Sequence, residues 1–234
     1  EVDSIAQLQK SSWGDAKTEE TAEYIPEISI HSRMGYEHDF LEQVGRFDGN
    51  GLYLGIDGNI SPNFSYSFYH CIASSDSQGL FGFDNTQWLT VSYENDWLNL
   101  TAGKNAVMVG SFEYDGYDID SYYFMNSSFW NSFDCWQWGA SASFYPDDDH
   151  ELTIQVCNSP FSFGEPNLFA YALGWRGEME WFESLWTANM WQYDKGSYMK
   201  SMNFANRFDF DDFSFDLEYM TRATDIKDLF TRDF

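Results

Sequence analysis

The feature that most constrains the fold is an alternation of apolar and polar residues over most of the chain. Leu152, Ile154 and Val156, for example, lie two residues apart, with Thr153 and Gln155 between them. A period of two residues is that of a β-strand whose two faces meet different surroundings. Long helical patterns are missing from the sequence, so the alternation predicts an all-β protein.

The alternation predicts about eleven antiparallel strands. They cover residues 28–37, 51–60, 64–74, 88–93, 98–102, 136–144, 151–157, 169–175, 182–190, 201–209 and 213–219. Short turns at 61–63, 94–96, 146–149, 177–179 and 211–212 alternate with connections at 39–50, 75–84, 104–133, 160–166, 194–197 and 222–228. Strands of about ten residues, with short turns on one side and mostly longer loops on the other, are typical of a transmembrane β-barrel.

Two parts of the chain differ in character. Residues 1–26 are polar and without a sustained period, and we interpret them as an N-terminal extension ending at Pro26. Residues 27–234 form the predicted barrel domain. Bacterial barrels have an even strand number and no open edge, so eleven strands, or twelve with a short one at 229–234, predict a barrel that is incomplete at its C-terminal end.

The composition of the polar rows separates a barrel from a β-sandwich in water, which alternates as well. These rows consist mainly of Ser, Thr, Gly, Asn and Gln, which suit a wet lumen better than an open surface. His70, Lys104 and Lys200 interrupt the apolar rows only at the loop ends of strands, where a cation costs about 0–1 kcal/mol instead of roughly 2–4. We therefore expect the apolar rows to face lipid, and keep a soluble, aromatic-rich carbohydrate-binding β-domain as an alternative.

Charge and cysteine content exclude other classes. The net charge of -26 repels nucleic acid, which we exclude as a partner. Four scattered histidines and the lack of a nucleophile motif or phosphate-binding glycine loop predict that the protein is not an enzyme and needs no cofactor. The three cysteines lack metal-site spacing; Cys135 and Cys157 either pair across one hairpin or are small side chains on neighbouring strands.

The connection 104–133 is unusually long and rich in aromatic residues. A loop of this length in a compact all-β chain is commonly functional, and its aromatic content argues against disorder. We expect it to fold inward and narrow a pore. The predicted constriction residues are Lys104, Glu113, Asp115, Asp118 and Asp120. The three aspartates are also a weak candidate for a Ca²⁺ site, because their oxygens are hard ligands although their spacing is not that of an EF-hand.

Further charged residues fall on the polar rows or at their ends. We predict that they line the lumen: His31, Arg33, Glu37, Asp57, Glu183, Arg207, Asp216 and Glu218. Opposed charges across a pore orient polar solutes, whereas charges paired along the wall only stiffen it. The sequence leaves both interpretations open.

Several stretches together resemble the phosphate-selective porin O and P family of Gram-negative outer membranes. They are SRMGYE at 32–37, AGK closing 98–104, EYD at 113–115, FWN at 129–131, QVCNSPF at 155–161 and NRF at 206–208. The resemblance implies an outer-membrane barrel of about sixteen strands, commonly a trimer, whose third extracellular loop folds into the lumen. It also implies passive diffusion of small hydrophilic solutes or ions.

The charge of the long loop departs from that family. Phosphate selectivity depends on Arg and Lys, whereas Lys104 is the one cation among the four loop acids. A ring of acids selects cations. The sequence therefore predicts a porin without phosphate specificity, as a homotrimer or part of an envelope complex. The alternative is a barrel plugged by its loop that serves as a structural subunit of a larger outer-membrane complex.

Overall fold

The computed structural model describes residues 25–41, 43–73, 83–112, 132–162, 164–210 and 213–231. Its strands are β1 (Glu27–Asp39), β2 (Val44–Ser61), β3 (Phe64–Ala73), β4 (Thr86–Asn95), β5 (Leu98–Ala106), β6 (Trp136–Asp147), β7 (His150–Asn158), β8 (Phe169–Met179), β9 (Phe182–Asp194), β10 (Ser197–Phe210) and β11 (Phe213–Ala223). Two short 3₁₀ turns, η1 (Phe83–Asn85) and η4 (Ile226–Asp228), lie wholly inside these ranges.

Every strand pairs with the next one along the chain. The result is one antiparallel sheet of 11 strands in the order β1 to β11. This confirms the predicted all-β class and the predicted strand number. Within the described part of the chain, no helix has the length and hydropathy needed to cross a membrane.

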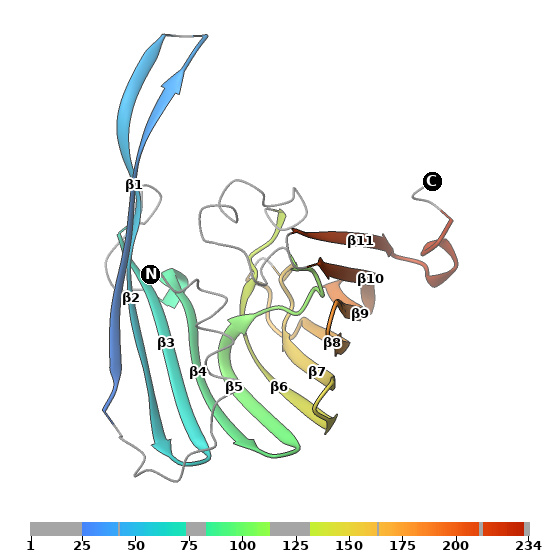
Figure 1. Cartoon of the computed structure of the whole chain (residues 1–234). Helices are drawn as coiled ribbons and strands as arrows, with labels where there is room; N and C mark the ends of the chain where they lie inside the picture. The colour runs from blue at the N-terminus through green and yellow to red at the C-terminus, as the bar shows by residue number, and fades with distance from the viewer. Residues whose placement is uncertain are drawn as a thin grey trace.

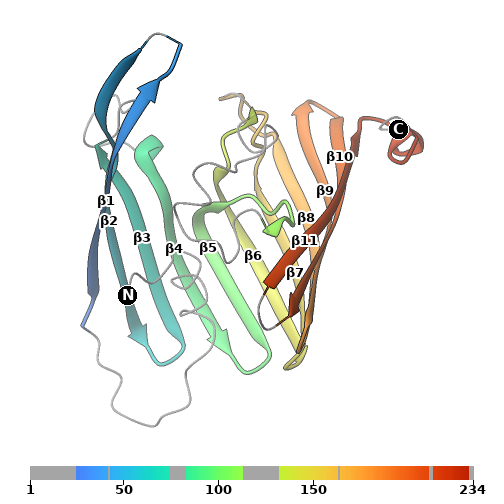
Figure 2. The same ribbon diagram turned by 45° about the horizontal axis from the view of Figure 1, so that its top comes forward.

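The sheet is curled, and its two edge strands lie apart (Figures 1 and 2). In the described residues β1 and β11 each pair on one side only, with β2 and β10. The first part of the connection after β5 turns into the concavity between the two halves of the sheet (Figure 2). We call the face on that side the inner face and the opposite one the outer face.

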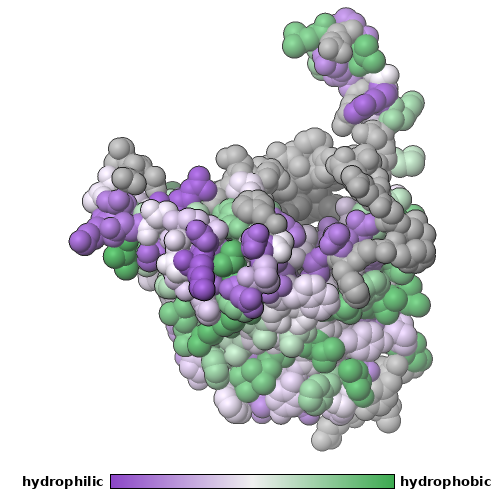
Figure 3. Space-filling view, turned by 180° about the vertical axis from the view of Figure 1, so that it is seen from behind, coloured by the Kyte–Doolittle hydropathy of each residue, from purple (hydrophilic) through white to green (hydrophobic). Residues whose placement is uncertain are grey.

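The large apolar side chains of β8 lie on the exposed outer face and its small residues on the inner face. On β8 the outward Phe169, Tyr171 and Leu173 are 38%, 41% and 49% exposed, whereas the inward Ala170 and Ala172 are 2% and 6% exposed. A sheet that folds around a dry core in water has the reverse distribution. From behind, hydrophobic side chains gather over the lower half of the molecule, with strongly hydrophilic ones above them (Figure 3).

Aromatic pairs run across the outer face from strand to strand. The rings of Trp175 and Trp186 are 5.1 Å apart, and those of Trp186 and Phe204 are 5.7 Å apart. Farther along, the Phe208 and Phe215 rings stack at 4.9 Å. Each such cross-strand pair contributes roughly 0.2–1 kcal/mol, so the outer face helps to fix the register although it is exposed.

One predicted connection is wrong: residues 39–50 are not a long loop. Pairing of β1 with β2 continues to Asp39↔Val44, whereas pairing of β2 with β3 stops at Leu52↔Ala73. The ends of β1 and β2 therefore form a two-stranded ribbon, the projecting hairpin, which rises beyond the other strands (Figure 1). Neither of its faces lies on a third strand, so its residues need not alternate, and the sequence pattern missed it.

The close pairing of β6 with its neighbours predicts that Gly139 cannot be enlarged. A Cβ atom on Gly139 would lie 2.4 Å from the Cys157 Cβ and 2.4 Å from the Val156 carbonyl oxygen. We expect Gly139→Ala to lower the free energy of unfolding by about 1–3 kcal/mol, because overpacked backbone must move apart. Denaturant unfolding followed by tryptophan fluorescence measures this.

The matched control is Gly35→Ala, because a Cβ atom on Gly35 would meet no atom within 4 Å. Its unfolding midpoint should stay at the wild-type value. Equal midpoints for the two variants would contradict the close approach of β6 and β7 at Gly139.

Candidate functional site

A short backbone segment runs across the strands on the inner face of the sheet. Residues 107–112, the crossing segment, leave the end of β5 and pass over β7 to β11 (Figure 2). Side chains from four strands bind its backbone. Two backbone N–H groups donate to side chains: Met108 N–H to Gln155 Oε1 on β7 (2.7 Å) and Phe112 N–H to Glu218 Oε1 on β11 (2.7 Å). Two carbonyl groups accept from side chains: Val109 from the Thr187 hydroxyl on β9 (2.5 Å) and Gly110 from the Asn203 amide on β10.

These bonds satisfy backbone groups that no strand partner reaches. Buried N–H and C=O groups must find partners, and here inward polar side chains supply them. The crossing segment is the beginning of the predicted constriction loop 104–133. Its inward course agrees with the expectation for that loop, whose residues 113–131 lie outside the described ranges.

Glycine is required at the middle of the crossing segment. Gly110 has φ +84, a left-handed conformation that side chains with a Cβ rarely adopt. A Cβ atom there would also lie 2.2 Å from the Thr187 Cγ2 atom. The segment therefore lies against β9 at this residue.

A small apolar cluster fixes the first half of the crossing segment, which follows β5, to the sheet. Val107 and Val109 pack with Cys157, Ala170 and Trp191, and all five are almost fully buried. Rings from the neighbouring connections close the cluster: the Phe133 ring lies 5.1 Å and the Phe161 ring 5.7 Å from the Trp191 ring. The crossing segment and the rings of the neighbouring connections therefore cover this part of the inner face of β7 to β10.

The cysteines of this region are free thiols, so the suggested Cys135–Cys157 bond is not formed. Cys157 is 4% exposed beneath the crossing segment. Burial, with the charge of Asp134 in addition, raises the pKa of Cys135 to about 12. Its thiol is protonated and weakly nucleophilic at neutral pH.

Four charged residues form a row of ion pairs on the inner face of β8 to β11. The Arg207 guanidinium bonds both carboxylate oxygens of Asp216, at 2.9 Å and 3.1 Å. Glu183 lies between the two arginines, 3.4 Å from Arg176 and 3.9 Å from Arg207. The Arg207 guanidinium carbon also lies 4.3 Å from the centre of the Phe112 ring. We call Arg176, Glu183, Arg207 and Asp216 the ion-pair row.

The structure thus brings together four predicted lumen residues, Glu183, Arg207, Asp216 and Glu218. The charges of Glu183, Arg207 and Asp216 are paired with one another and with Arg176 along the sheet. This favours the interpretation of charges paired along the wall over that of opposed charges across a pore. Sequence reasoning missed Arg176. The alternation along β8 places Arg176 in the same inward row as Ala172 and Gly174, so it could have been predicted from the sequence. It also missed Glu94, which accepts from Asn99 Nδ2 (3.2 Å), and Glu151, which accepts from the Thr153 hydroxyl (2.6 Å).

Predicted lumen residues on the first strands lie beside a stack of aromatic rings. The Tyr69 ring is nearly parallel to those of Tyr53 (5.2 Å) and Trp88 (4.3 Å), and the His31 ring lies 5.7 Å from it. Asp57 accepts from the Ser67 hydroxyl, which accepts in turn from Trp88 Nε1 at 2.7 Å. Arg33 and Glu37 belong to β1, and their side chains lie outside the described part of the structure.

Lys104 was predicted as the first residue of the constriction loop, and this boundary is wrong. It lies inside β5, paired with Leu89 and Trp138, and is 5% exposed. The strand continues to Ala106 because its backbone pairs with the start of β6. The described part of the connection therefore starts at Val107, three residues later than predicted.

The remaining constriction residues, Glu113, Asp115, Asp118 and Asp120, lie outside the described ranges, and with them the Ca²⁺ candidate. Among the described residues, no group of three or more His, Cys, Asp or Glu side chains is arranged to hold a metal ion.

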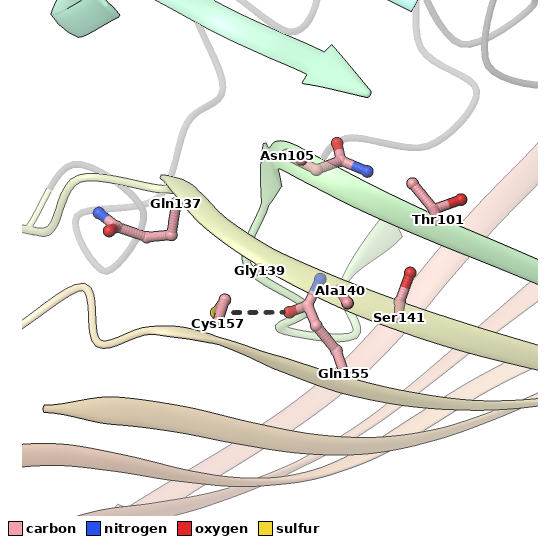
Figure 4. A pocket seen from close by; sticks show the side chains of 9 residues that line it. Thr101, Asn105, Gln137, Gly139, Ala140, Ser141, Gln155 and Cys157 are labelled. Carbon is pink, nitrogen blue, oxygen red and sulfur yellow. Dashed lines mark hydrogen bonds between the residues drawn. The ribbon is translucent and has the colours of Figure 1, made fainter. Parts of the chain in front are cut away.

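A small polar hollow lies on the inner face of β5 to β7 (Figure 4). Its volume of about 10 Å³ is room for roughly one water molecule. Its lining includes Thr101, Asn105, Gln137, Ser141 and Gln155. Gln155 already bonds the Met108 N–H and the Ala106 carbonyl, so one of the polar side chains that line the hollow is engaged by the backbone beside it.

Comparison with known proteins adds no identification. No family model matches the chain, and no curated protein matches it. The resemblance to the porin O and P family stays a prediction from sequence.

The fit of the crossing segment predicts a specific effect of Gly110→Ala. The new methyl group collides with Thr187 and strains the backbone, so the segment should lift and uncover Cys157. We expect labelling of Cys157 by a water-soluble maleimide to accelerate by about tenfold or more. This corresponds to a fall of roughly 1.4 kcal/mol in the free energy needed to expose the thiol. Mass spectrometry of the labelled peptides identifies the reacting cysteine.

Gly164→Ala is the control, because Gly164 also has a positive φ (+88) but a Cβ atom there would meet nothing within 4 Å. Its Cys157 labelling should equal that of the wild type. An unchanged rate in Gly110→Ala would show that the crossing segment does not cover this thiol.

Proposed function

We propose that the chain forms wall strands of a transmembrane β-barrel in the outer membrane of a Gram-negative bacterium, and that this barrel acts as a porin for small hydrophilic solutes or ions. The distribution of side chains between the two faces of the sheet carries the proposal. Apolar rows on the outside and polar, hydrogen-bonded rows on the inside are the arrangement that lipid requires of a barrel. An exposed apolar face of this extent would be a liability in water.

Basic side chains at the margins of the apolar rows support a membrane setting. Lys200 Nζ donates to the Thr224 carbonyl beyond the end of β11 (2.7 Å), and His70 bonds the hydroxyl of Thr86, the first residue of β4 (3.0 Å). Both therefore find polar partners near the loop ends of strands, where long basic side chains reach the interface at low cost.

The open edges set a requirement. Backbone groups on an unpaired strand edge cannot remain in hydrocarbon, so β1 and β11 need further strands beside them. The barrel of about sixteen strands that the family resemblance implies would provide these strands.

The described inner face favours cations. The two arginines of the ion-pair row, Arg176 and Arg207, are held by acids, while Asp57, Glu94, Glu151 and Glu218 add negative charge. The four loop acids that follow Phe112 in the sequence have the same sign. A lumen with excess carboxylates attracts cations and repels phosphate.

A second function is favoured by one observation: the apolar cluster around Trp191 covers part of the inner face. A loop packed in this way would also suit a plugged barrel that serves as a structural subunit of a larger envelope complex. Conductance separates the two functions.

The orientation of the sheet can be tested along one strand. In a cysteine-free background, nitroxide labels placed singly at 169 to 175 on β8 of the reconstituted protein should alternate in environment. We expect labels at Phe169, Tyr171 and Leu173 to collide with oxygen dissolved in lipid, and labels at Ala170 and Ala172 to exclude it. Electron paramagnetic resonance relaxation measures both. Alternation of the opposite sense would indicate a soluble β-domain.

Planar-bilayer recording tests transport itself. The protein should give stepwise conductance with a reversal potential that favours cations in a salt gradient. Replacing Glu113, Asp115, Asp118 and Asp120 together by amides should move the reversal potential towards zero, because the fixed charge that attracts cations is removed. Silence of the folded protein would support the plugged barrel, and an unchanged reversal potential would exclude the loop acids as the selectivity determinant.

A further inference from the structure

The far end of the crossing segment is bound differently from the rest of it. Gln155, Thr187 and Asn203 bind the segment through neutral groups, whereas the Phe112 N–H donates to the carboxylate of Glu218 at 2.7 Å. A hydrogen bond to an ionised acceptor is roughly twice as strong as a neutral one. The strongest bond to the segment therefore lies at its last described residue.

The Phe112 side chain is held at the same place. Phe112 is fully buried (0% exposed), and the Arg207 guanidinium lies over its ring at 4.3 Å. Arg207 cannot swing away easily, because Asp216 holds it through two bonds and Glu183 lies on its other side. A cation fixed over an aromatic ring attracts the face of that ring.

We propose that Glu218 is the positioning residue of the constriction loop, with Arg207 as its support. Glu218 fixes the Phe112 backbone and Arg207 fixes the Phe112 ring, so two side chains of the wall determine where the acidic part of the loop begins. Glu113 follows Phe112 directly in the sequence. The proposal deepens the porin function and rests on it for its effect on conductance, while the contact itself can be measured separately.

The experiment compares Glu218→Ala with Glu218→Gln in the protein reconstituted in lipid nanodiscs. Both variants lose the same charge, but glutamine keeps an acceptor oxygen at the same reach. Glu165→Ala is the control, because Glu165 is an exposed loop acid with no side-chain bond to the crossing segment. Hydrogen exchange of the Phe112 amide, followed by nuclear magnetic resonance, is the direct measurement.

In the wild type the Phe112 amide should exchange as slowly as amides paired between strands. In Glu218→Ala its exchange should accelerate roughly ten- to hundredfold, because a charge-assisted bond is lost. Exchange in Glu165→Ala should stay within about threefold of the wild type, since the acceptor is untouched. Exchange in Glu218→Gln should lie between that of the wild type and that of Glu218→Ala, since glutamine keeps an acceptor oxygen but loses its charge. Equal rates in the two Glu218 variants would overturn the proposal. Fast exchange in the wild type would overturn it as well, even if Glu218→Ala does not fold.

Bilayer recording then connects the contact to the pore. Glu218→Ala should change the mean conductance and add fluctuations that Glu218→Gln lacks, although the two carry the same charge. If the wild type is silent in bilayers while the exchange rates behave as expected, the porin function is wrong and the positioning role stands. If the wild type conducts but Phe112 exchange does not respond to Glu218→Ala, the positioning role is wrong.

Discussion

The rest of the structure depends on the continuous pairing of eleven antiparallel strands, each with the next along the chain. Side chains alternate between the two faces of a strand, so a shift of one residue would move every apolar side chain from one face to the other. Pairing from β4 to β11 keeps the apolar residues in line, as in Ile154↔Leu173, Leu173↔Ala188 and Trp186↔Phe204. The sheet therefore has an outer face that is mainly apolar and an inner face that carries most of the polar side chains, and each can meet a different medium.

The polar face has a second role, which is to bind backbone. Hydroxyl, amide and carboxylate groups on neighbouring strands take up the N–H and C=O groups of the crossing segment, as strand partners would elsewhere. Small residues leave the space for it: Gly174 lies under Met108, and Ala170 lies in the apolar cluster. The same side chains that would face water in an open lumen thus give a loop a defined path over the wall.

Most of the strand framework could be predicted from the sequence, because alternation reports directly on the two faces of a sheet. The prediction failed where alternation carries no information. The projecting hairpin has no face against a third strand, and its Phe47, 87% exposed, meets the Tyr36 ring of the paired strand. At the site, Glu183, Arg207, Asp216 and Glu218 could be placed on the inner face by parity alone. Parity could not reveal that Arg207 bonds Asp216 or that Glu218 binds Phe112, because these contacts depend on distances between strands and on the course of a loop.

The projecting hairpin is joined to the remaining sheet only through its own two strands. Its pairing with the body ends at Leu52↔Ala73, and an irregularity in β1 between Ser32 and Met34 lies close to that level. A two-stranded ribbon is marginally stable by itself. The ribbon can therefore fray and re-form as an independent cooperative unit, while the register of every other strand pair stays intact.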